Sequence, residues 1–121
     1  MTVEDARILV ERQARAWERA DLDAIVADFA PNGVFISPNG RWEGKDAIRQ
    51  TAMDFFAAAR DVKINVSRVI LMNNFGAVEW TWNETRIATG KRHMTDDAII
   101  FTVRDGKIFY WREYFDTAQT K

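Results

Sequence analysis

Near the end of the chain, residues 92–115 read RHMTDDAIIFTVRDGKIFYWREYF. Two runs rich in β-branched and aromatic residues, Arg92 to Val103 and Lys107 to Phe115, stand on either side of Asp105-Gly106. An Asp-Gly pair suits the tight turn of a β-hairpin, because both central residues of that turn adopt positive φ angles. The stretch therefore predicts two long antiparallel strands joined by a two-residue turn.

Two earlier runs have the same character. They cover Lys63 to Met72 and Ala77 to Ala88, and Asn73-Asn74 and Thr89-Gly90 separate them from their neighbours. The sequence thus predicts an antiparallel meander of four strands. Strands of this length exceed the average, and long strands twist and coil. We expect the sheet to curve around the helices that pack on its inner face.

The N-terminal half follows helical spacing. Thr2, followed three residues later by Asp5, resembles a capping box, and apolar residues behind it recur at helical intervals. Pro31-Asn32-Gly33 ends a second, shorter run. We expect helices over residues 2–20, 21–30 and 45–60, with a short strand over 34–36. Helices first and a meander after them predict an α+β fold, and the length fits a single domain over 1–121.

The composition argues against several classes of function. The net charge is −1, the isoelectric point is about 5.8 and no stretch concentrates Lys and Arg, so we expect no nucleic-acid or membrane partner. The chain has no cysteine, one histidine, no glycine-rich phosphate loop and no metal-ligand spacing among its carboxylates. We therefore expect no metal and no cofactor. The lack of cysteine and of a signal-peptide pattern favours a cytoplasmic location.

Three phrases carry a resemblance to a known family. They are DLDAIVADF at residues 21–29, WEGKDAI at 42–48, and DGKI at 105–108 followed by WREYFD at 111–116. Their order and spacing resemble the SnoaL-like group of the nuclear transport factor 2-like superfamily over nearly the whole chain. The resemblance implies a cone-shaped α+β barrel, in which the N-terminal helices pack in a curved antiparallel sheet. It also implies a pocket at the open end of the cone and a homodimer through the outer face of the sheet.

Strand alternation singles out Asp97 as a candidate acid or base. Alternate residues from His93 to Val103 share one face, and the apolar end of that face should point inward. Asp97 then lies at the inner edge, where apolar neighbours would raise its pKa, or else it is a strand-end carboxylate in solvent. His93, nearer the rim, is either a proton relay or an exposed histidine. Both alternatives stay open for both residues.

Glu113 lies between Trp111 and Phe115 on one face of the last strand, so it is either an inward carboxylate or an outward charge. The phrase WREYFD resembles the corresponding strand of limonene epoxide hydrolases, and this resemblance implies a catalytic acid at Glu113. That family also needs Arg-x-Asp on an earlier strand. Here Glu84 stands for the acid, but Trp82 replaces the arginine, so the two carboxylates lack their cation.

Ketosteroid isomerases of the same superfamily carry their general base as an Asp directly before a proline, whereas Ser37 precedes Pro38 in this chain. Their oxyanion-hole tyrosine falls near Trp17, and their second oxyanion-hole acid falls near Asp97. Tryptophan donates one N–H bond but carries no proton that titrates in this range. The resemblance to this set is therefore incomplete.

The aromatic residues are expected to form both the core and the wall of the pocket, which are continuous in such a cone. Trp42 stands in a loop before the third predicted helix, where it either closes over the pocket mouth or anchors the loop. The aromatic residues expected to contact a ligand are Trp17, Phe35, Trp42, Phe56, Trp80, Trp82, Phe101, Trp111 and Phe115.

Two functions stand as alternatives. The first is a cofactor-free isomerase, cyclase or hydrolase that acts on a small hydrophobic molecule by acid–base chemistry. Glu113 and Asp97 would transfer protons, with Glu84 and His93 in support. The second is a non-catalytic domain that binds a small ligand or another protein. This second function predicts that Glu113 and Asp97 both lie in solvent.

Overall fold

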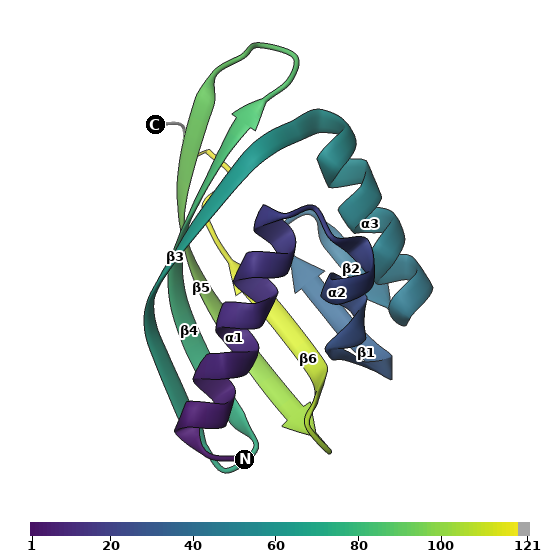
Figure 1. The fold of residues 1–121 in the computed structure, drawn as a ribbon, viewed down its shortest axis with the longest axis vertical. Helices are drawn as coiled ribbons and strands as arrows, with labels where there is room; N and C mark the ends of the chain where they lie inside the picture. Colours follow the sequence, from purple (N-terminus) through teal and green to yellow (C-terminus); the bar gives the residue numbers. More distant parts are fainter. Residues whose placement is uncertain (119–121) are drawn as a thin grey trace.

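The computed structural model describes residues 1–118, and Figure 1 shows helices packed against one curved sheet. The helices are α1 (Val3–Glu18), α2 (Leu22–Ala27) and α3 (Lys45–Ala58). The strands are β1 (Phe29–Ser37), β2 (Gly40–Glu43), β3 (Ala59–Met72), β4 (Phe75–Arg86), β5 (Arg92–Arg104) and β6 (Lys107–Tyr114). The predicted α+β fold class is confirmed. No helix within residues 1–118 is both long and apolar enough to cross a membrane.

The strands form one sheet in the order β2-β1-β6-β5-β4-β3. The predicted meander is confirmed, because β3 to β6 each pair antiparallel with the next strand along the chain. β1 pairs in parallel with β6, so the complete sheet is mixed. A parallel pair needs a long crossover, which the chain from β2 through α3 to β5 provides.

The hairpin that joins β5 to β6 has the predicted turn. Asp105 and Gly106 have φ angles of 52° and 76°, the left-handed region that the tight turn requires. Arg104 and Lys107 close the ladder on either side of them. This turn sets which side chains of β5 and β6 share the inner face.

β1 begins at Phe29 rather than at Val34, where the sequence placed the first strand. Its pairing with β6 shifts between these two residues. Gly33 lies in this irregular part, and a Cβ there would lie only 2.8 Å from the backbone oxygen of Ile108. Pro31-Asn32-Gly33 therefore follows the end of α2, as predicted, but belongs to an irregular strand.

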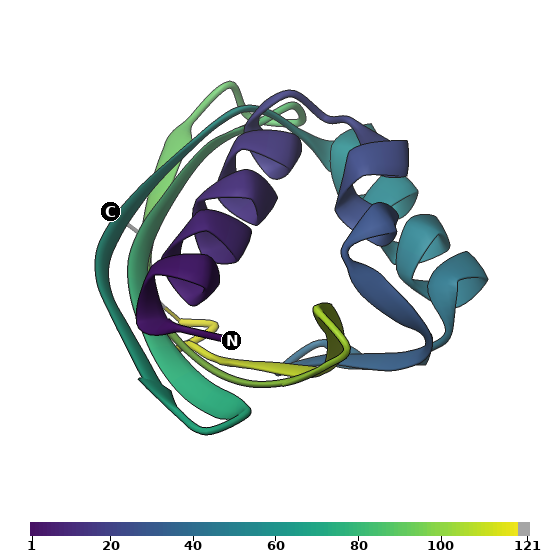
Figure 2. The same cartoon turned by 60° about the horizontal axis from the view of Figure 1, so that its bottom comes forward.

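The sheet curves around α1, as Figure 2 shows. The helices α2 and α3 lie on the other side of the opening, facing α1 and the long strands. Apolar side chains from both layers fill much of the space between the helices and the sheet. Leu9, Ile25, Ile48, Ile99 and Phe101 are at most 1% exposed. This arrangement is the expected cone, with the helices inside the curved sheet.

The C-terminal half of α1 is tied to β3, which positions Trp17. The carboxylate of Glu18 accepts the backbone N–H of Ile64 at 2.8 Å, and Arg15 donates to the backbone oxygen of Ile64 at 2.9 Å. At the other end of α1, Thr2 and Asp5 form the predicted capping box. Fixed at both ends, α1 presents Trp17 to the interior of the cone.

Candidate functional site

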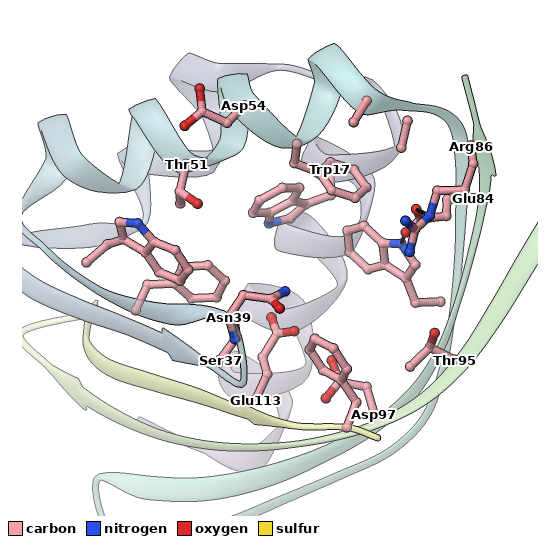
Figure 3. A pocket seen from close by; sticks show the side chains of 17 residues that line it. Trp17, Ser37, Asn39, Thr51, Asp54, Glu84, Arg86, Thr95, Asp97 and Glu113 are labelled. Carbon is pink, nitrogen blue, oxygen red and sulfur yellow. Dashed lines mark hydrogen bonds and ion pairs between the residues drawn. The ribbon is translucent and has the colours of Figure 1, made fainter. Parts of the chain in front are cut away.

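A cavity of about 380 Å³ lies between the helices and the inner face of the sheet (Figure 3). Its size falls within the range of small-molecule sites, which is about 300–1,000 Å³. Side chains from α1 and α3 line it, together with residues of β1, β2, β4, β5 and β6. β3 contributes only its first residue, Ala59. The cavity is therefore bounded by the helices and by the strands from β2 to β4 in the order of the sheet.

Aromatic side chains form much of the lining. Trp17 contacts Phe55 and Trp82 edge to face, with ring centroids 5.9 Å and 5.6 Å away. Trp42 is stacked on Phe35, with centroids 5.4 Å apart, so this ring both lines the cavity and anchors β2 to β1. We call the following residues the aromatic wall: Trp17, Phe35, Trp42, Phe55, Trp82 and Phe115.

Asp97 lies inside the cavity and is only 6% exposed. Its partner across the β4–β5 ladder is Trp80, whose indole Nε1 donates to Asp97 Oδ2 at 3.1 Å. The other oxygen, Oδ1, is buried and receives no N–H donor from residues 1–118. Of the two placements that the sequence left open, the structure has the inward one.

Glu113 reaches the cavity from β6, the strand next to β5. Ile99 pairs with Glu113, and Asp97 precedes Ile99 by two residues, so the two carboxyls are diagonal neighbours on the inner face. Glu113 Oε2 accepts a hydrogen bond from the indole Nε1 of Trp111 at 2.9 Å. Figure 3 shows both acidic side chains at the same end of the cavity.

The two carboxyls have strongly altered acidity. Burial, and after it the charge of Glu113 and a hydrogen bond with it, raises the pKa of Asp97 to about 10. Burial also raises the pKa of Glu113, against the opposing effect of hydrogen bonds from Asp97 and Trp111. Two adjacent carboxyls in an apolar site do not both ionise readily, so at least one of them holds a proton near neutral pH. The pair thus combines a proton donor with a proton acceptor.

Glu84 is bound from two sides. Trp82 Nε1 donates to its Oε1 at 2.9 Å, and Arg86 Nε lies 2.6 Å from its Oε2. The Glu84 side chain is 11% exposed and that of Arg86 is 53% exposed. The resemblance to limonene epoxide hydrolases left the carboxylates without an arginine, because Trp82 stands at its position. Arg86 supplies a cation in the cavity, but it neutralises Glu84 rather than the pair formed by Asp97 and Glu113. Within residues 1–118 no three carboxylate or imidazole side chains form a group that could hold a metal ion.

His93 does not line the cavity, contrary to its predicted supporting role in the site. It pairs with Glu84 across the β4–β5 ladder and lies two residues beyond Thr95, the β5 residue at the rim of the lining. The shared strand face was correctly inferred. The face continues toward the loop between β4 and β5, where Glu84 and Arg86 of β4 line the cavity and His93 of β5 does not.

Four aromatic residues predicted to contact a ligand lie behind the cavity surface instead. Trp80, Phe101 and Trp111 are at most 2% exposed and belong to the core. Phe56 packs against Trp17 at 5.6 Å, while Phe55, the preceding residue of α3, lines the cavity. The period of a strand or helix gives the face but not the depth. The other five predicted residues do line the cavity: Trp17, Phe35, Trp42, Trp82 and Phe115.

Several polar residues of the lining were not foreseen. Arg86 shares a strand face with Glu84, so the alternation that selected Glu84 could also have found it. Thr51 and Asp54 stand at helical spacing on α3, one turn from each other. Asn39, in the turn between β1 and β2, projects into the cavity beside Glu113 (Figure 3). No pattern in the sequence marks this last residue.

Comparison with known families identifies the class of protein. A family model described as the SnoaL-like domain matches residues 10–111. The chain therefore belongs to the SnoaL-like domain family. No curated protein matches the sequence significantly.

Solved structures share the fold over nearly the whole chain. A protein with a ketosteroid isomerase-like fold from Catenulispora acidiphila, in complex with trimethylamine, has a TM-score of 0.87 and 16% identity, and the match covers 93% of this chain and 88% of that one. A proposed polyketide cyclase from Xanthomonas campestris has a TM-score of 0.84 and 21% identity, with coverage of 93% and 91%. An LEH-like epoxide hydrolase from M. tuberculosis has a TM-score of 0.82 and 20% identity, with coverage of 97% and 86%. These similarities confirm the nuclear transport factor 2-like fold.

Proposed function

We propose that this protein is a cofactor-free enzyme that isomerises, cyclises or hydrates a small, mostly apolar molecule by acid–base chemistry. One observation carries the proposal: Asp97 and Glu113 lie side by side in an aromatic cavity, where burial raises the pKa of both carboxyls. A general acid and a general base are most effective when their pKa values are brought near the working pH. Burial raises the pKa of both carboxyls, and with a pKa of about 10 Asp97 still holds its proton at neutral pH, where it can act as the acid.

The pair can perform a balanced proton transfer. Glu113, the more accessible carboxyl, accepts a proton from a carbon next to a carbonyl group or from a water molecule. Asp97 donates its proton to the oxygen on which negative charge develops. One proton leaves the substrate and one enters it, so the pair returns to its starting charge after the protons are redistributed. Isomerisation, aldol-type cyclisation and hydration all use this exchange.

Two tryptophans support the pair from the core. Trp80 donates to Asp97 and Trp111 donates to Glu113, each through an indole N–H that does not titrate. These bonds hold the carboxyls in place whatever their protonation state. Trp80 and Trp111 are therefore positioning residues rather than ligand contacts, and Glu84 positions Arg86 in the same way elsewhere in the cavity.

A domain that only binds a ligand predicts Asp97 and Glu113 in solvent. Asp97 is 6% exposed, and the Glu113 side chain is directed into the cavity. Placing two carboxyls in an apolar cavity costs stability, and a binder for a neutral molecule has no need for that cost. These placements support the enzymatic function over the binding-only alternative.

Proton exchange tests the proposal without a known substrate. A panel of apolar ketones in D2O should acquire deuterium next to the carbonyl, and small epoxides in ¹⁸O-labelled water should yield labelled diols, both followed by mass spectrometry. Glu113→Gln should slow the productive reaction by about a hundredfold or more, because it removes the base. Glu79→Gln is the control, since Glu79 is an exposed carboxylate paired with Arg68 at 3.4 Å. Undiminished turnover by Glu113→Gln would remove Glu113 from the mechanism.

Two further predictions from the sequence remain predictions. One is a cytoplasmic location. The other is a homodimer through the outer face of the sheet, which presents the exposed apolar side chains of Ile70, Ile100 and Tyr114. We propose that a second copy of the chain covers this face.

A further inference from the structure

The charged groups of the cavity do not balance. Arg86 is the one cationic side chain in the lining formed by the described residues, and its Nε is bound by Glu84 at 2.6 Å. Asp54 adds an exposed carboxylate on α3, near the mouth. The Asp97–Glu113 pair therefore faces the cavity without a cation of its own.

Asp97 shows the same deficit at a single atom. The residue is 6% exposed, and its Oδ1 is buried and receives no N–H donor from residues 1–118. When either of the two carboxyls is ionised, its negative charge lies in a largely apolar space without a cation of its own. A buried charge without a counter-ion is costly, and a buried acceptor without a donor adds to that cost. A ligand that brings both a positive charge and an N–H donor would remove both costs.

The aromatic wall is suited to the same ligand. Indole and phenyl faces attract cations, and this attraction grows when the cation is removed from water. Trp17, Trp82 and Phe55 stand together on one side, and Phe35 and Trp42 are stacked on another. A hydrocarbon group also packs well against these rings. The wall can therefore hold the apolar part of a molecule while its cationic end approaches the carboxyls.

We propose that the substrate is an apolar amine bound in its protonated form, with the ammonium N–H directed at Asp97 Oδ1, the reacting carbon beside Glu113 and the hydrocarbon part against the aromatic wall. This inference deepens the proposed function, on which it rests for the identity of the reacting end of the cavity. A single positive charge pairs with one ionised carboxyl of the two and favours its ionisation. An anionic molecule that seeks Arg86 is the opposite case, and it is an outcome of the test below.

Three probes of one shape separate the cases by calorimetry at pH 7. They are 1-naphthylmethylamine, which is a cation, 1-naphthylmethanol, which is neutral, and 1-naphthoate, which is an anion. The amine should bind at least about tenfold more tightly than the alcohol, as expected for a charge-assisted hydrogen bond in a site of low polarity. The inference fails if the alcohol binds as tightly as the amine, or if the naphthoate binds most tightly. This ranking needs only the unaltered protein.

Variants locate the preference. Asp97→Asn and Glu113→Gln should each reduce the affinity for the amine about tenfold and leave the affinity for the alcohol nearly unchanged. Glu79→Gln, on the outer face of the sheet, should change neither. Equal losses for amine and alcohol would mean that the carboxyls only maintain the shape of the cavity, which overturns the inference. Ketone exchange without a preference for the amine would overturn the inference and leave the proposed function standing, whereas a preference for the amine without any exchange activity would show a cation-binding site and overturn the amine as a substrate.

Discussion

Trp80 and Asp97 face each other directly across the β4–β5 ladder, and the indole N–H of Trp80 is the hydrogen-bond donor to the buried carboxyl of Asp97. The same arrangement recurs within the cavity. Trp82 donates to Glu84 and Trp111 donates to Glu113, each at 2.9 Å. Three carboxyl groups in one site are thus each held by a tryptophan of the sheet. An indole is a large apolar group with one fixed donor, so it fills the core and satisfies an acceptor together.

Replacing Trp80 by Phe tests this role. The change removes the donor to Asp97 but keeps an aromatic ring in the core, so we expect a loss of about 1–3 kcal/mol in the free energy of unfolding. Denaturant unfolding measures the loss. Trp17→Phe is the matched control, because Trp17 is also buried, at 8% exposed, and the replacement keeps an aromatic ring there. Similar losses in the two variants would mean that ring volume, rather than the N–H group, is what Trp80 contributes.

The raised pKa of Asp97 predicts how stability depends on pH. The folded protein binds this proton up to about pH 10, whereas the ordinary carboxyl value is 3.8. The native state therefore holds more protons than the unfolded state between these limits. The stabilising contribution is complete below about pH 4 and is lost as the pH rises toward 10, with a slope of at most about 1.4 kcal/mol per pH unit for one proton.

Asp97→Asn removes this titration. We expect the variant to gain stability relative to the original protein as the pH rises from 5 to 9, as measured by denaturant unfolding at each pH. Glu79→Gln should follow the original curve, because Glu79 is exposed. A constant difference between Asp97→Asn and the original protein over this interval would show that Asp97 is already ionised at neutral pH.

The hairpin and the meander could be predicted from the sequence because the patterns that specify them are local. Asp105-Gly106 indicated a hairpin, because both residues suit the positive φ angles of a tight turn. The long runs of β-branched residues indicated a meander, and strands of that length twist, so a curved sheet was expected. The parallel pairing of β1 with β6 was different. It joins segments far apart in the chain, and nothing in Phe29–Ser37 shows which strand edge it will meet.

The sequence predicted which side chains of the site face the inside of the sheet. It did not predict which of these line the cavity and which lie in the core. Alternation correctly grouped Asp97 with Phe101 and Glu113 with Trp111, yet one member of each group lines the cavity and the other lies in the core. Depth depends on how α1 and α3 sit over the sheet, which is a tertiary property. The ion pair between Arg12 and the 5% exposed Asp28 is a similar case, because it joins α1 to the end of α2 without any local signal.

The outer face of the sheet predicts a dimer that can be broken. Ile70, Ala77, Ile100 and Arg112 form one row across four strands, and Ile100 is 43% exposed. Light scattering should report about twice the 14.0 kDa mass of the chain. Ile100→Lys should yield monomers, because it places a charge in the proposed interface. Ile8→Lys is the control on the exposed side of α1. A monomeric original protein would contradict the homodimer outright.

Glu84→Gln tests how the charge of Arg86 is used. Glu84 binds the Nε of Arg86 and cancels its charge within the cavity, while Trp82 holds Glu84 in place. Replacing the carboxylate by an amide keeps a hydrogen-bond acceptor for Arg86 but leaves the positive charge uncompensated. We expect the affinity for 1-naphthoate to rise about threefold or more, a modest effect because the Arg86 side chain is 53% exposed and screened by solvent.

Calorimetry at low ionic strength measures this affinity, and added salt should reduce the gain. Glu43→Gln, in an exposed pair with Arg41 on β2, should leave naphthoate binding unchanged. If Glu84→Gln leaves it unchanged as well, the charge of Arg86 does not reach a bound ligand.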